Sequence, residues 1–210
     1  MNDATKRSVF ANINTAEYWD HVYSEEWNRG QVLSENYNRD YGPIHDAIIE
    51  LIEDGARVLD IACGPGIFCR KVAQRRPNAT VLGVDFSQYT LEKNREVDRK
   101  LKVEYVCTDI RNSLPSIKRE FDVVTMCEIL EHLDDAERVV AEAMSLVRPG
   151  GRFIITTPHD NEIPDPEHVR QWGHDELFHL LAPYSDTICF QHFPPPYFHV
   201  WMMAYLTKRQ

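Results

Sequence analysis

The sequence predicts an α/β fold built on a mostly parallel β-sheet with helices on both faces. Three observations carry this prediction. Short apolar runs alternate with segments of helical periodicity between residues 57 and 158, which is typical of parallel strands buried on both faces. The first apolar run leads into a helix through a turn with two glycines. Two β-rich runs, 186–193 and 197–208, are separated by prolines and predict an antiparallel hairpin.

Length and composition suit one domain with a small lid. The 210 residues are 43% hydrophobic and 27% charged, as in ordinary soluble proteins. We expect residues 1–42, rich in charges and aromatic rings, to form an N-terminal helical lid, and residues 43–210 to form the main domain. The polar start and the lack of an apolar run near 18 residues predict a cytoplasmic protein with no membrane partner.

The charge of the chain bears on its partners. A formal net charge of −10 repels an extended nucleic acid unless a local basic patch compensates. The most basic stretch, residues 93–102, is interrupted by acids and is typical of an exposed helix face. We therefore expect a small-molecule acceptor rather than a nucleic acid. A homodimer is left open.

The first regular element of the main domain is an amphipathic helix over residues 43–55. Pro43 suits its first turn and Gly55 its end. Apolar residues recur at i, i+3, i+4, i+7 and i+8 along it, which places them on one helix face: Ile44, Ala47, Ile48, Leu51 and Ile52.

The alternation that follows predicts five strands and the helices between them. The predicted strands are 57–63, 80–86, 102–110, 121–128 and 152–158. The predicted helices are 66–76, 88–98 and 135–147, with a further one at 173–182 before the hairpin. Apolar runs this short, separated by helical patterns, indicate a sheet covered by helices.

The turn after the first strand has the composition of a ligand cradle. Gly64 and Gly66 lie just past the strand's carboxyl end, where open parallel sheets bind ligands. Glycine lets a ligand approach the backbone closely, and amides at the start of the next helix can face its polar groups. The third glycine of a dinucleotide motif is replaced by Cys69, which weighs against a nicotinamide enzyme.

Polar residues also end the next three predicted strands. Asp85 follows Asp60 by 25 positions and ends the second strand, where a carboxylate can accept hydrogen bonds from both ribose hydroxyls. Asp109 ends the third strand, within reach of an adenine amino group. Cys127 and Glu128 end the fourth. These strand ends meet at one edge of the sheet, so they predict a site for one nucleoside-like molecule.

Together the segments VLDIACGPG, GVDF, CTDI, FDVVTMCEILEHL and LVRPGGRFIITTP resemble the class I S-adenosylmethionine-dependent methyltransferase superfamily. The resemblance covers about residues 44–158 and, in outline, the terminal hairpin. Ala62 stands where this family often has glycine. The resemblance implies a Rossmann-like sheet of seven strands in the order 3-2-1-4-5-7-6, with the last strand antiparallel. It also implies an enzyme, with S-adenosyl-L-methionine as its cofactor.

The same resemblance implies which residues contact that cofactor. Asp60, the Cys127 carbonyl and the backbone of the glycine turn would contact its methionine part. Asp85 would bind its ribose, and the residues after the second and third strands would contact its adenine. The full set is Asp60, Ala62, Cys63, Gly64, Gly66, Asp85, Phe86, Asp109, Ile110 and Cys127, with Tyr18 added from the lid.

The stretch CEILEHLDD carries the groups suited to chemistry. Glu128, Glu131 and His132 stand at i, i+3 and i+4, one face if the segment is helical. Two carboxylates and an imidazole so placed can hold Mg²⁺ or another divalent metal, and one of the later histidines, His159, His168 or His174, can complete the set. The resemblance to enzymes that methylate the 3′ end of small RNAs implies His168. The candidate catalytic residues are His132, Glu128 and His168; the candidate metal ligands are Glu128, Glu131, His132 and His168.

Two metal-dependent branches of the superfamily resemble this stretch: catechol O-methyltransferases of quinone biosynthesis, and enzymes that methylate the 3′-terminal ribose of small RNAs. In both, a metal would lower the pKa of an acceptor hydroxyl. Without a metal, His132 is either a general base or a packing residue. Several functions therefore stay open. They are methyl transfer to oxygen or nitrogen of a small molecule, the two metal-dependent reactions, and a role as a non-catalytic partner subunit that binds the cofactor.

Overall fold

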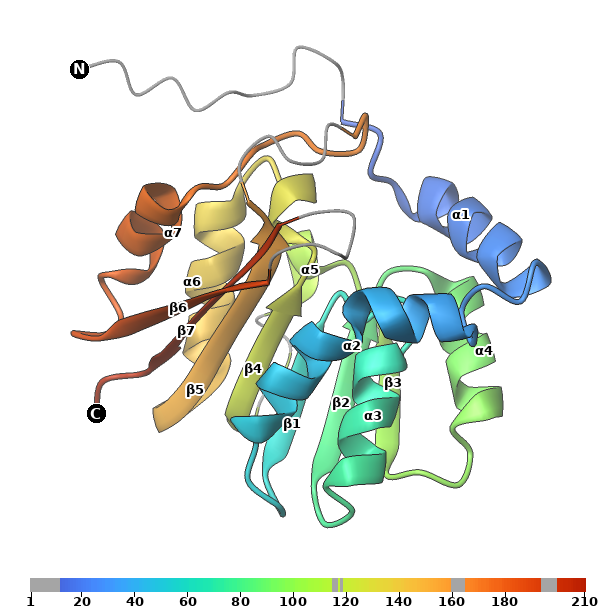
Figure 1. The fold of residues 1–210 in the computed structure, drawn as a ribbon, viewed down its shortest axis with the longest axis horizontal. Helices are drawn as coiled ribbons and strands as arrows, with labels where there is room; N and C mark the ends of the chain where they lie inside the picture. Colours follow the sequence, from blue (N-terminus) through green and yellow to red (C-terminus); the bar gives the residue numbers. More distant parts are fainter. Residues whose placement is uncertain (1–11, 115–116, 118, 160–164, 194–199) are drawn as a thin grey trace.

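The centre of the molecule is a seven-stranded sheet (Figure 1). The computed structural model describes residues 12–114, 117, 119–159, 165–193 and 200–210. The strand order is β3-β2-β1-β4-β5-β7-β6, as the sequence predicted. β1 to β5 run parallel, and β7 is antiparallel to both of its neighbours. The strands are β1 (Arg57–Ile61), β2 (Thr80–Asp85), β3 (Val103–Cys107), β4 (Phe121–Cys127), β5 (Val147–Pro158), β6 (Ile188–Phe193) and β7 (Trp201–Thr207).

Helices cover both faces of this sheet (Figure 1). α2, α3 and α4 bury their apolar side chains in one core cluster, and α5, α6 and α7 bury theirs in the other. The helices are α1 (Ala16–Asn28), α2 (Glu35–Glu50), α3 (Ile67–Arg75), α4 (Gln88–Val97), α5 (Ile110–Ser113), α6 (Ala136–Leu146) and α7 (His174–Leu181), with a 3₁₀ turn η2 (Leu130–His132). Within the described residues, no helix combines the length and the apolar character needed to cross a bilayer.

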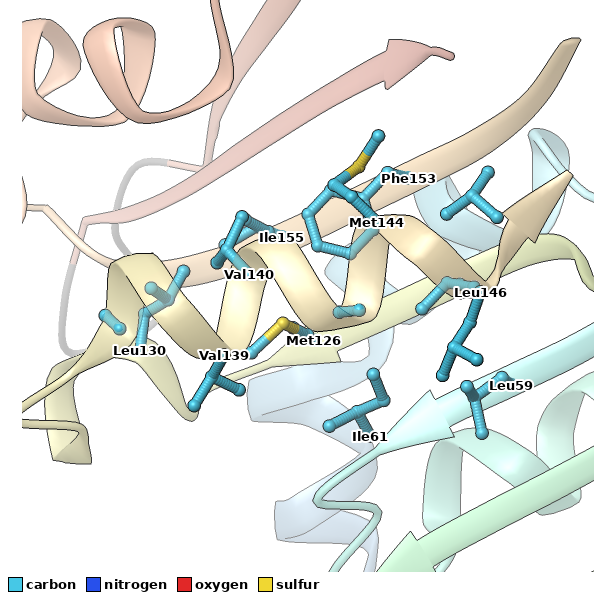
Figure 2. Packing of buried hydrophobic residues seen from close by; sticks show 14 of the residues in the cluster. Leu59, Ile61, Met126, Leu130, Val139, Val140, Met144, Leu146, Phe153 and Ile155 are labelled. Atoms are coloured by element: carbon cyan, nitrogen blue, oxygen red, sulfur yellow. The ribbon is translucent and has the colours of Figure 1, made fainter. Parts of the chain in front are cut away.

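Figure 2 shows how α6 holds the centre of the sheet. Its buried Val140 and Met144 lie in one cluster with Met126 of β4, Phe153 of β5 and Ile61 of β1. Fully burying side chains of this size contributes about 1.5–3 kcal/mol each. The packing therefore fixes β1 and β4 against each other, and the carboxyl ends of these two strands carry the candidate site.

One predicted boundary is wrong. The helix expected to begin at Pro43 begins at Glu35 and contains Pro43, and it ends before Gly55. An interior proline removes a helical hydrogen bond and costs about 3 kcal/mol. The ring of Tyr41 in this helix lies 5.4 Å from that of Trp201, and an aromatic pair of this kind contributes about 0.5–1.5 kcal/mol, which offsets part of the cost. The division at residues 42 and 43 falls inside this helix, and the separate lid stays a prediction.

The N-terminal helix α1 docks on the first residues of α4. Trp27 Nε1 donates to Thr90 Oγ1 over 3.1 Å, and the carboxylate of Asp20 accepts hydrogen bonds from the Ser87 hydroxyl and the Tyr89 amide. These contacts place α1 beside the carboxyl end of β2. Aromatic side chains of α1 thereby reach the candidate site.

Candidate active site

The turn after β1 is a backbone cradle held from two sides. Ala62, Gly64 and Gly66 all have positive φ, at 59°, 47° and 69°, a region that favours glycine. The Gly64 amide donates to the Asp85 carboxylate over 2.9 Å, and the Gly64 carbonyl accepts from Asn94 Nδ2 over 2.9 Å. Hydrogen bonds from two other elements of the protein therefore hold the turn.

Two adjoining cavities open at the carboxyl ends of the parallel strands. The larger, about 450 Å³, is here called the β1–β4 cavity, and the smaller is called the β2–β3 cavity. They share a wall made by Trp19, Tyr23, Ala62, Glu128 and His132. Because α1 supplies the first two of these side chains, it closes over both cavities.

Most of the predicted site residues line one of these cavities. The β1–β4 cavity is lined by Asp60, Ala62, Cys63, Gly64, Cys127, Glu128, Glu131, His132 and His168 among others. The β2–β3 cavity is lined by Ala62, Asp85, Phe86, Asp109, Ile110, Glu128 and His132 among others. The strand-end pattern in the sequence thus brought together residues from four strands.

Two predicted cofactor contacts, Gly66 and Tyr18, lie outside both linings. A Cβ at Gly66 would stand 2.6 Å from Tyr105 Oη and 2.9 Å from Asn94, so glycine is needed there for packing. The hydroxyl of Tyr18 donates instead to the carboxylate of Glu167. The roles of Gly66 and Tyr18 as cofactor contacts stay predictions.

Two buried aspartates stand behind the glycine turn. Asp60 is 2% exposed and accepts from Thr125 Oγ1 over 2.7 Å and from Cys69 Sγ over 3.3 Å. Asp85 accepts the amides of Gly64 and Ser87. Burial raises the pKa of each carboxyl to about 6. A buried carboxylate that lines a cavity is stabilised by a cation brought to it, and Asp60 has that position.

At the end of β3, Asp109 is already paired. Its carboxylate accepts hydrogen bonds from the Arg111 guanidinium over 2.9 Å at each oxygen and caps α5. Burial acts to raise the pKa of Asp109, but the hydrogen bonds from Arg111 outweigh it and lower the pKa. The Arg111 guanidinium also lies 5.6 Å from the ring centre of Phe86. This wall of the β2–β3 cavity is a fixed ion pair beside an aromatic face.

The turn after β4 differs from the helix that the sequence suggested. Glu128 has φ of 53° and is not helical, while Glu131 and His132 belong to the 3₁₀ turn η2. Glu128 Oε1 accepts from Thr156 Oγ1 over 2.7 Å, but Oε2 is buried without a hydrogen-bond partner among the described residues. Two carboxylates are thus brought together without sharing a helix face.

Burial perturbs the acids and the imidazole of this turn. It raises the pKa of Glu131 to about 8, and together with repulsion from Glu131 it raises the pKa of Glu128 well above its usual range. Burial, followed by the nearby His168, lowers the pKa of His132 to about 4. Shifts of this kind cluster at functional sites, where burial opposes the charged form of a group and a ligand of opposite charge can stabilise it.

Glu131, His132 and His168 form a compact set of donor atoms. One ligand atom from each lies within 4.8 Å of the others. His132 Nδ1 lies 3.1 Å from the Glu167 carbonyl oxygen, which can only accept, so Nδ1 carries the proton and Nε2 offers its lone pair to a metal. One carboxylate and two imidazoles suit a divalent transition metal. Glu128, the fourth predicted ligand, is not part of this set.

The sequence reasoning missed several residues of the β1–β4 cavity. His45 of α2 lines it with 7% of its surface exposed, and Glu26 and Glu167 line it as acids. A histidine next to Ile44 on the apolar face of a predicted helix was an available signal for His45. No local pattern marked Glu167, which reaches His132 from 35 positions further along the chain.

Part of the chain is similar to a known family and to curated proteins. Residues 59–155, a little under half of the chain, match the family described as the methyltransferase domain. The ubiquinone biosynthesis O-methyltransferase of Coxiella burnetii is 34% identical over 109 residues, which are 51% of this chain and 45% of that protein. The same enzyme of Salmonella newport is 36% identical over 109 residues, 51% of this chain and 44% of that protein. The chain spans a little under half the length of these curated relatives.

Solved structures agree on the fold. Magnesium protoporphyrin IX methyltransferase from Synechocystis, with bound S-adenosylmethionine, matches over 100% of both chains with a TM-score of 0.74 and 14% identity. An N-methyltransferase from Bradyrhizobium japonicum matches over 91% of this chain and 99% of that chain with a TM-score of 0.70 and 15% identity. At such identities, the likeness concerns the fold alone.

Proposed function

We propose that this chain, which belongs to the class I S-adenosylmethionine-dependent methyltransferase superfamily, methylates a hydroxyl oxygen of a small-molecule acceptor with the help of a divalent metal. The observation that carries the proposal is the set of Glu131, His132 and His168, which lines the β1–β4 cavity. The curated relatives named ubiquinone biosynthesis O-methyltransferase support an oxygen acceptor, and the resemblance of the stretch CEILEHLDD to catechol O-methyltransferases favours a catechol.

The residues at the strand ends fit S-adenosyl-L-methionine. Asp60 offers a buried carboxylate for its ammonium group, and Gly64 presents backbone where a Cβ would meet Tyr23 Oη at 2.9 Å. Asp85, Phe86 and the ion pair at Asp109 would hold the ribose and the adenine. The cofactor supplies an electrophilic methyl group on its sulfonium. The chain's own task is to orient it and keep water out.

The residues of the β4 turn fit a divalent cation. Glu131 holds a carboxylate whose ionisation burial opposes, and a nearby cation would reverse that penalty. His132 presents Nε2 because its Nδ1–H is engaged with the Glu167 carbonyl. A metal held there would lower the pKa of an acceptor hydroxyl and orient vicinal oxygens.

The metal-free alternative, with His132 as general base, is less well matched to its environment. A general base works best with a pKa near the operating pH. Burial lowers the pKa of His132 to about 4, so its imidazole would take up a proton poorly near neutrality. The same neutral imidazole is the form that binds a metal.

Acidic side chains weigh against a phosphate-bearing acceptor such as the 3′-terminal ribose of an RNA. Glu26, Glu167 and Asp165 line the β1–β4 cavity together with Asp60 and Glu131. Carboxylates this dense repel an anion and favour a neutral or cationic acceptor. Amines and an RNA end are compared with catechols as acceptors in the test.

The test starts with protein dialysed against a chelator. Binding of S-adenosylmethionine and of Mg²⁺, Mn²⁺ and Zn²⁺ is measured by calorimetry for wild type and for His132→Ala. Methyl transfer is then followed by mass spectrometry with catechols, monophenols, amines and a short RNA. We expect cofactor binding in both proteins, a saturable metal site in wild type alone, and metal-dependent transfer to catechols.

Three outcomes would contradict the proposal at different points. Absence of cofactor binding by wild type would reject methyl transfer. Cofactor binding without a metal site, with turnover intact, would reject the role of the metal. Cofactor and metal binding without turnover of any acceptor would favour a non-catalytic partner subunit instead.

A further inference from the structure

The residues that precede α1 lie beside the β2–β3 cavity. Asn14 lines this cavity, and 5% of its surface is exposed. A buried amide is costly unless its donors and its oxygen find partners. The partners of Asn14 come from several elements, and they connect it to both parts of the site.

The hydrogen bonds of the Asn14 side chain fix its orientation. Its Nδ2 donates to the Glu167 carbonyl over 2.8 Å and to Asn12 Oδ1 over 2.7 Å. Its Oδ1 accepts from Trp19 Nε1 over 3.0 Å. Because a backbone carbonyl can only accept and an indole N–H can only donate, the amide group has one orientation that satisfies both.

The Glu167 carbonyl joins Asn14 to the proposed metal set. The same oxygen lies 3.1 Å from Nδ1 of His132, and a carbonyl oxygen has two lone pairs for two donors. Glu167 is followed by His168, the third member of the set, whose ring centre lies 5.0 Å from that of His132. One hydrogen bond from Asn14 therefore holds the group that orients His132 and the residue next to His168.

The backbone carbonyl of Asn14 reaches the wall of the β2–β3 cavity. It accepts from Arg111 Nη1 over 3.2 Å. The same guanidinium pairs with Asp109 and lies 5.6 Å from the ring centre of Phe86, and these residues form the wall proposed for the adenine. Asn14 is thus hydrogen-bonded to Arg111 on the cofactor side and to Glu167 on the metal side.

The helix α1, which follows Asn14, is an element that two ligands can stabilise together. It has no buried residue, and elements with few buried contacts open at low free energy. It supplies Trp19 and Tyr23 to the wall that the two cavities share. A ligand in either cavity therefore favours the docked position of α1 and of the segment before it, and a second ligand binds to an arrangement that is already formed.

We propose that Asn14 is a positioning residue that couples the two parts of the site, so that S-adenosylmethionine and the divalent metal each tighten the binding of the other. This inference rests on the proposed function. Coupling of this kind is reciprocal, because the two ligands share one thermodynamic cycle. Asn14 acts through Arg111 and the Glu167 carbonyl rather than on the reacting atoms.

The test measures the dissociation constant of Mn²⁺ by calorimetry in the absence of an acceptor, with and without saturating S-adenosylmethionine. In wild type we expect the cofactor to lower this constant by at least about fivefold, the lower end of typical coupling between two sites. Asn14→Asp keeps the size of the side chain and its acceptor for Trp19 but has no donor for the Glu167 carbonyl. In this variant we expect the two constants to agree within about twofold.

The ratio of the two constants separates coupling from other effects of the substitution. The added charge of Asn14→Asp acts on both constants alike and cancels in their ratio. Asn14→Leu removes the polar groups without adding charge and is also expected to lose the coupling, whereas Asn28→Leu, at an exposed asparagine of α1, is expected to keep it. A purely structural role of Asn14 would lower the unfolding temperature of its variants and leave the ratio unchanged.

Equal Mn²⁺ constants with and without cofactor in wild type would overturn the inference, and so would a wild-type ratio that persists in Asn14→Asp. The wild-type measurement needs no substitution, so it decides the matter even where a variant fails to fold. Failure of the proposed function looks different, because wild type would then bind no S-adenosylmethionine or no Mn²⁺. Independent binding of both ligands overturns the coupling alone.

Discussion

The turns after β1 and β4 are built alike in backbone and differently in side chains. Among the described residues, the two non-glycine positions with positive φ are Ala62 and Glu128, each directly after one of these central strands. In the β1 turn, the backbone amide and carbonyl of Gly64 are hydrogen-bonded to side chains of the protein, those of Asp85 and Asn94. The β4 turn leaves Glu128 Oε2 without a partner and raises the pKa of Glu131 to about 8.

The difference separates two ways of making a binding site. A turn whose polar groups are satisfied keeps its shape and offers backbone to a ligand. A turn whose carboxylates are buried and poorly paired costs free energy until a ligand compensates it. The first kind of turn suits a cofactor that is recognised by its shape, and the second kind suits a cation. Changes at the two turns should therefore affect different measurements.

The largest effect is expected at the β4 turn. Glu131→Gln removes the charged donor of the proposed metal set, and loss of metal assistance is worth several kcal/mol of transition-state stabilisation. We expect turnover to fall by at least about 100-fold while the dissociation constant for S-adenosylmethionine changes less than about threefold. Glu176→Gln, in the first turn of α7, is the matched control. Unchanged turnover in Glu131→Gln would show that the β4 turn does not carry the proposed metal-assisted chemistry.

Gly66→Ala breaks the β1 turn. The new Cβ would meet Tyr105 Oη at 2.6 Å at a φ of +69°. We expect a loss of about 2–4 kcal/mol in the free energy of unfolding, measured with urea, since strain and overlap add. Gly30→Ala has φ +68° with nothing within 4 Å and isolates the strain, about 1–2 kcal/mol. Equal losses of unfolding free energy in the two variants would mean that the side chains of Tyr105 and Asn94 move aside for the new Cβ at little cost.

Asp85→Ala removes the carboxylate that holds the β1 turn. The amides of Gly64 and Ser87 lose their acceptor, and each buried unpaired amide costs about 1–3 kcal/mol. We expect calorimetry to show S-adenosylmethionine binding weakened by a comparable free energy, with binding of metal ions to the β4 turn unchanged. Weakened metal binding in this variant would show that the two turns are coupled.

The pH dependence of metal binding sharpens the comparison further. Because burial raises the pKa of Glu131 to about 8, a metal must displace its proton at lower pH. Metal affinity is expected to rise by up to about tenfold per pH unit between pH 6.5 and 8 and to level off above. His132, with its pKa near 4, is neutral throughout this range. In Glu131→Gln, any residual metal affinity should no longer rise with pH, which calorimetry at several pH values would measure.

Ala62→Gly carries the smallest expected change. Ala62 has φ of 59°, where a Cβ is strained by about 1–2 kcal/mol, but glycine loses more chain entropy on folding. The two terms oppose each other, so we expect stability within about 1 kcal/mol of wild type and cofactor affinity nearly unchanged. A large loss of either would mean that the Ala62 methyl group contacts the ligand.

Periodicity and strand-end polarity predicted the alternating strands and helices, and they singled out side chains that line the two cavities. Asp60, Asp85 and Asp109 end buried apolar runs, and parallel strands bring such ends to one edge. The helix begins at Glu35 rather than at Pro43, and Tyr41 in its added part packs on Trp201, near the far end of the chain. Gly66 looked like a ligand contact, but its neighbours Tyr105 and Asn94 come from other elements.

The local pattern of residues therefore decided the strands and the carboxylates at their ends, because buried runs and turns are short-range properties. The order of the strands followed from the resemblance to the methyltransferase superfamily. The chemistry of the β4 turn was decided by tertiary structure. His168 joins Glu131 and His132, and the Glu167 carbonyl selects the free nitrogen of His132. Asn14 donates to the same carbonyl from the segment before α1. Burial and long-range contacts set the protonation and the hydrogen-bond partners of these groups, and neither is written in the spacing of neighbouring residues.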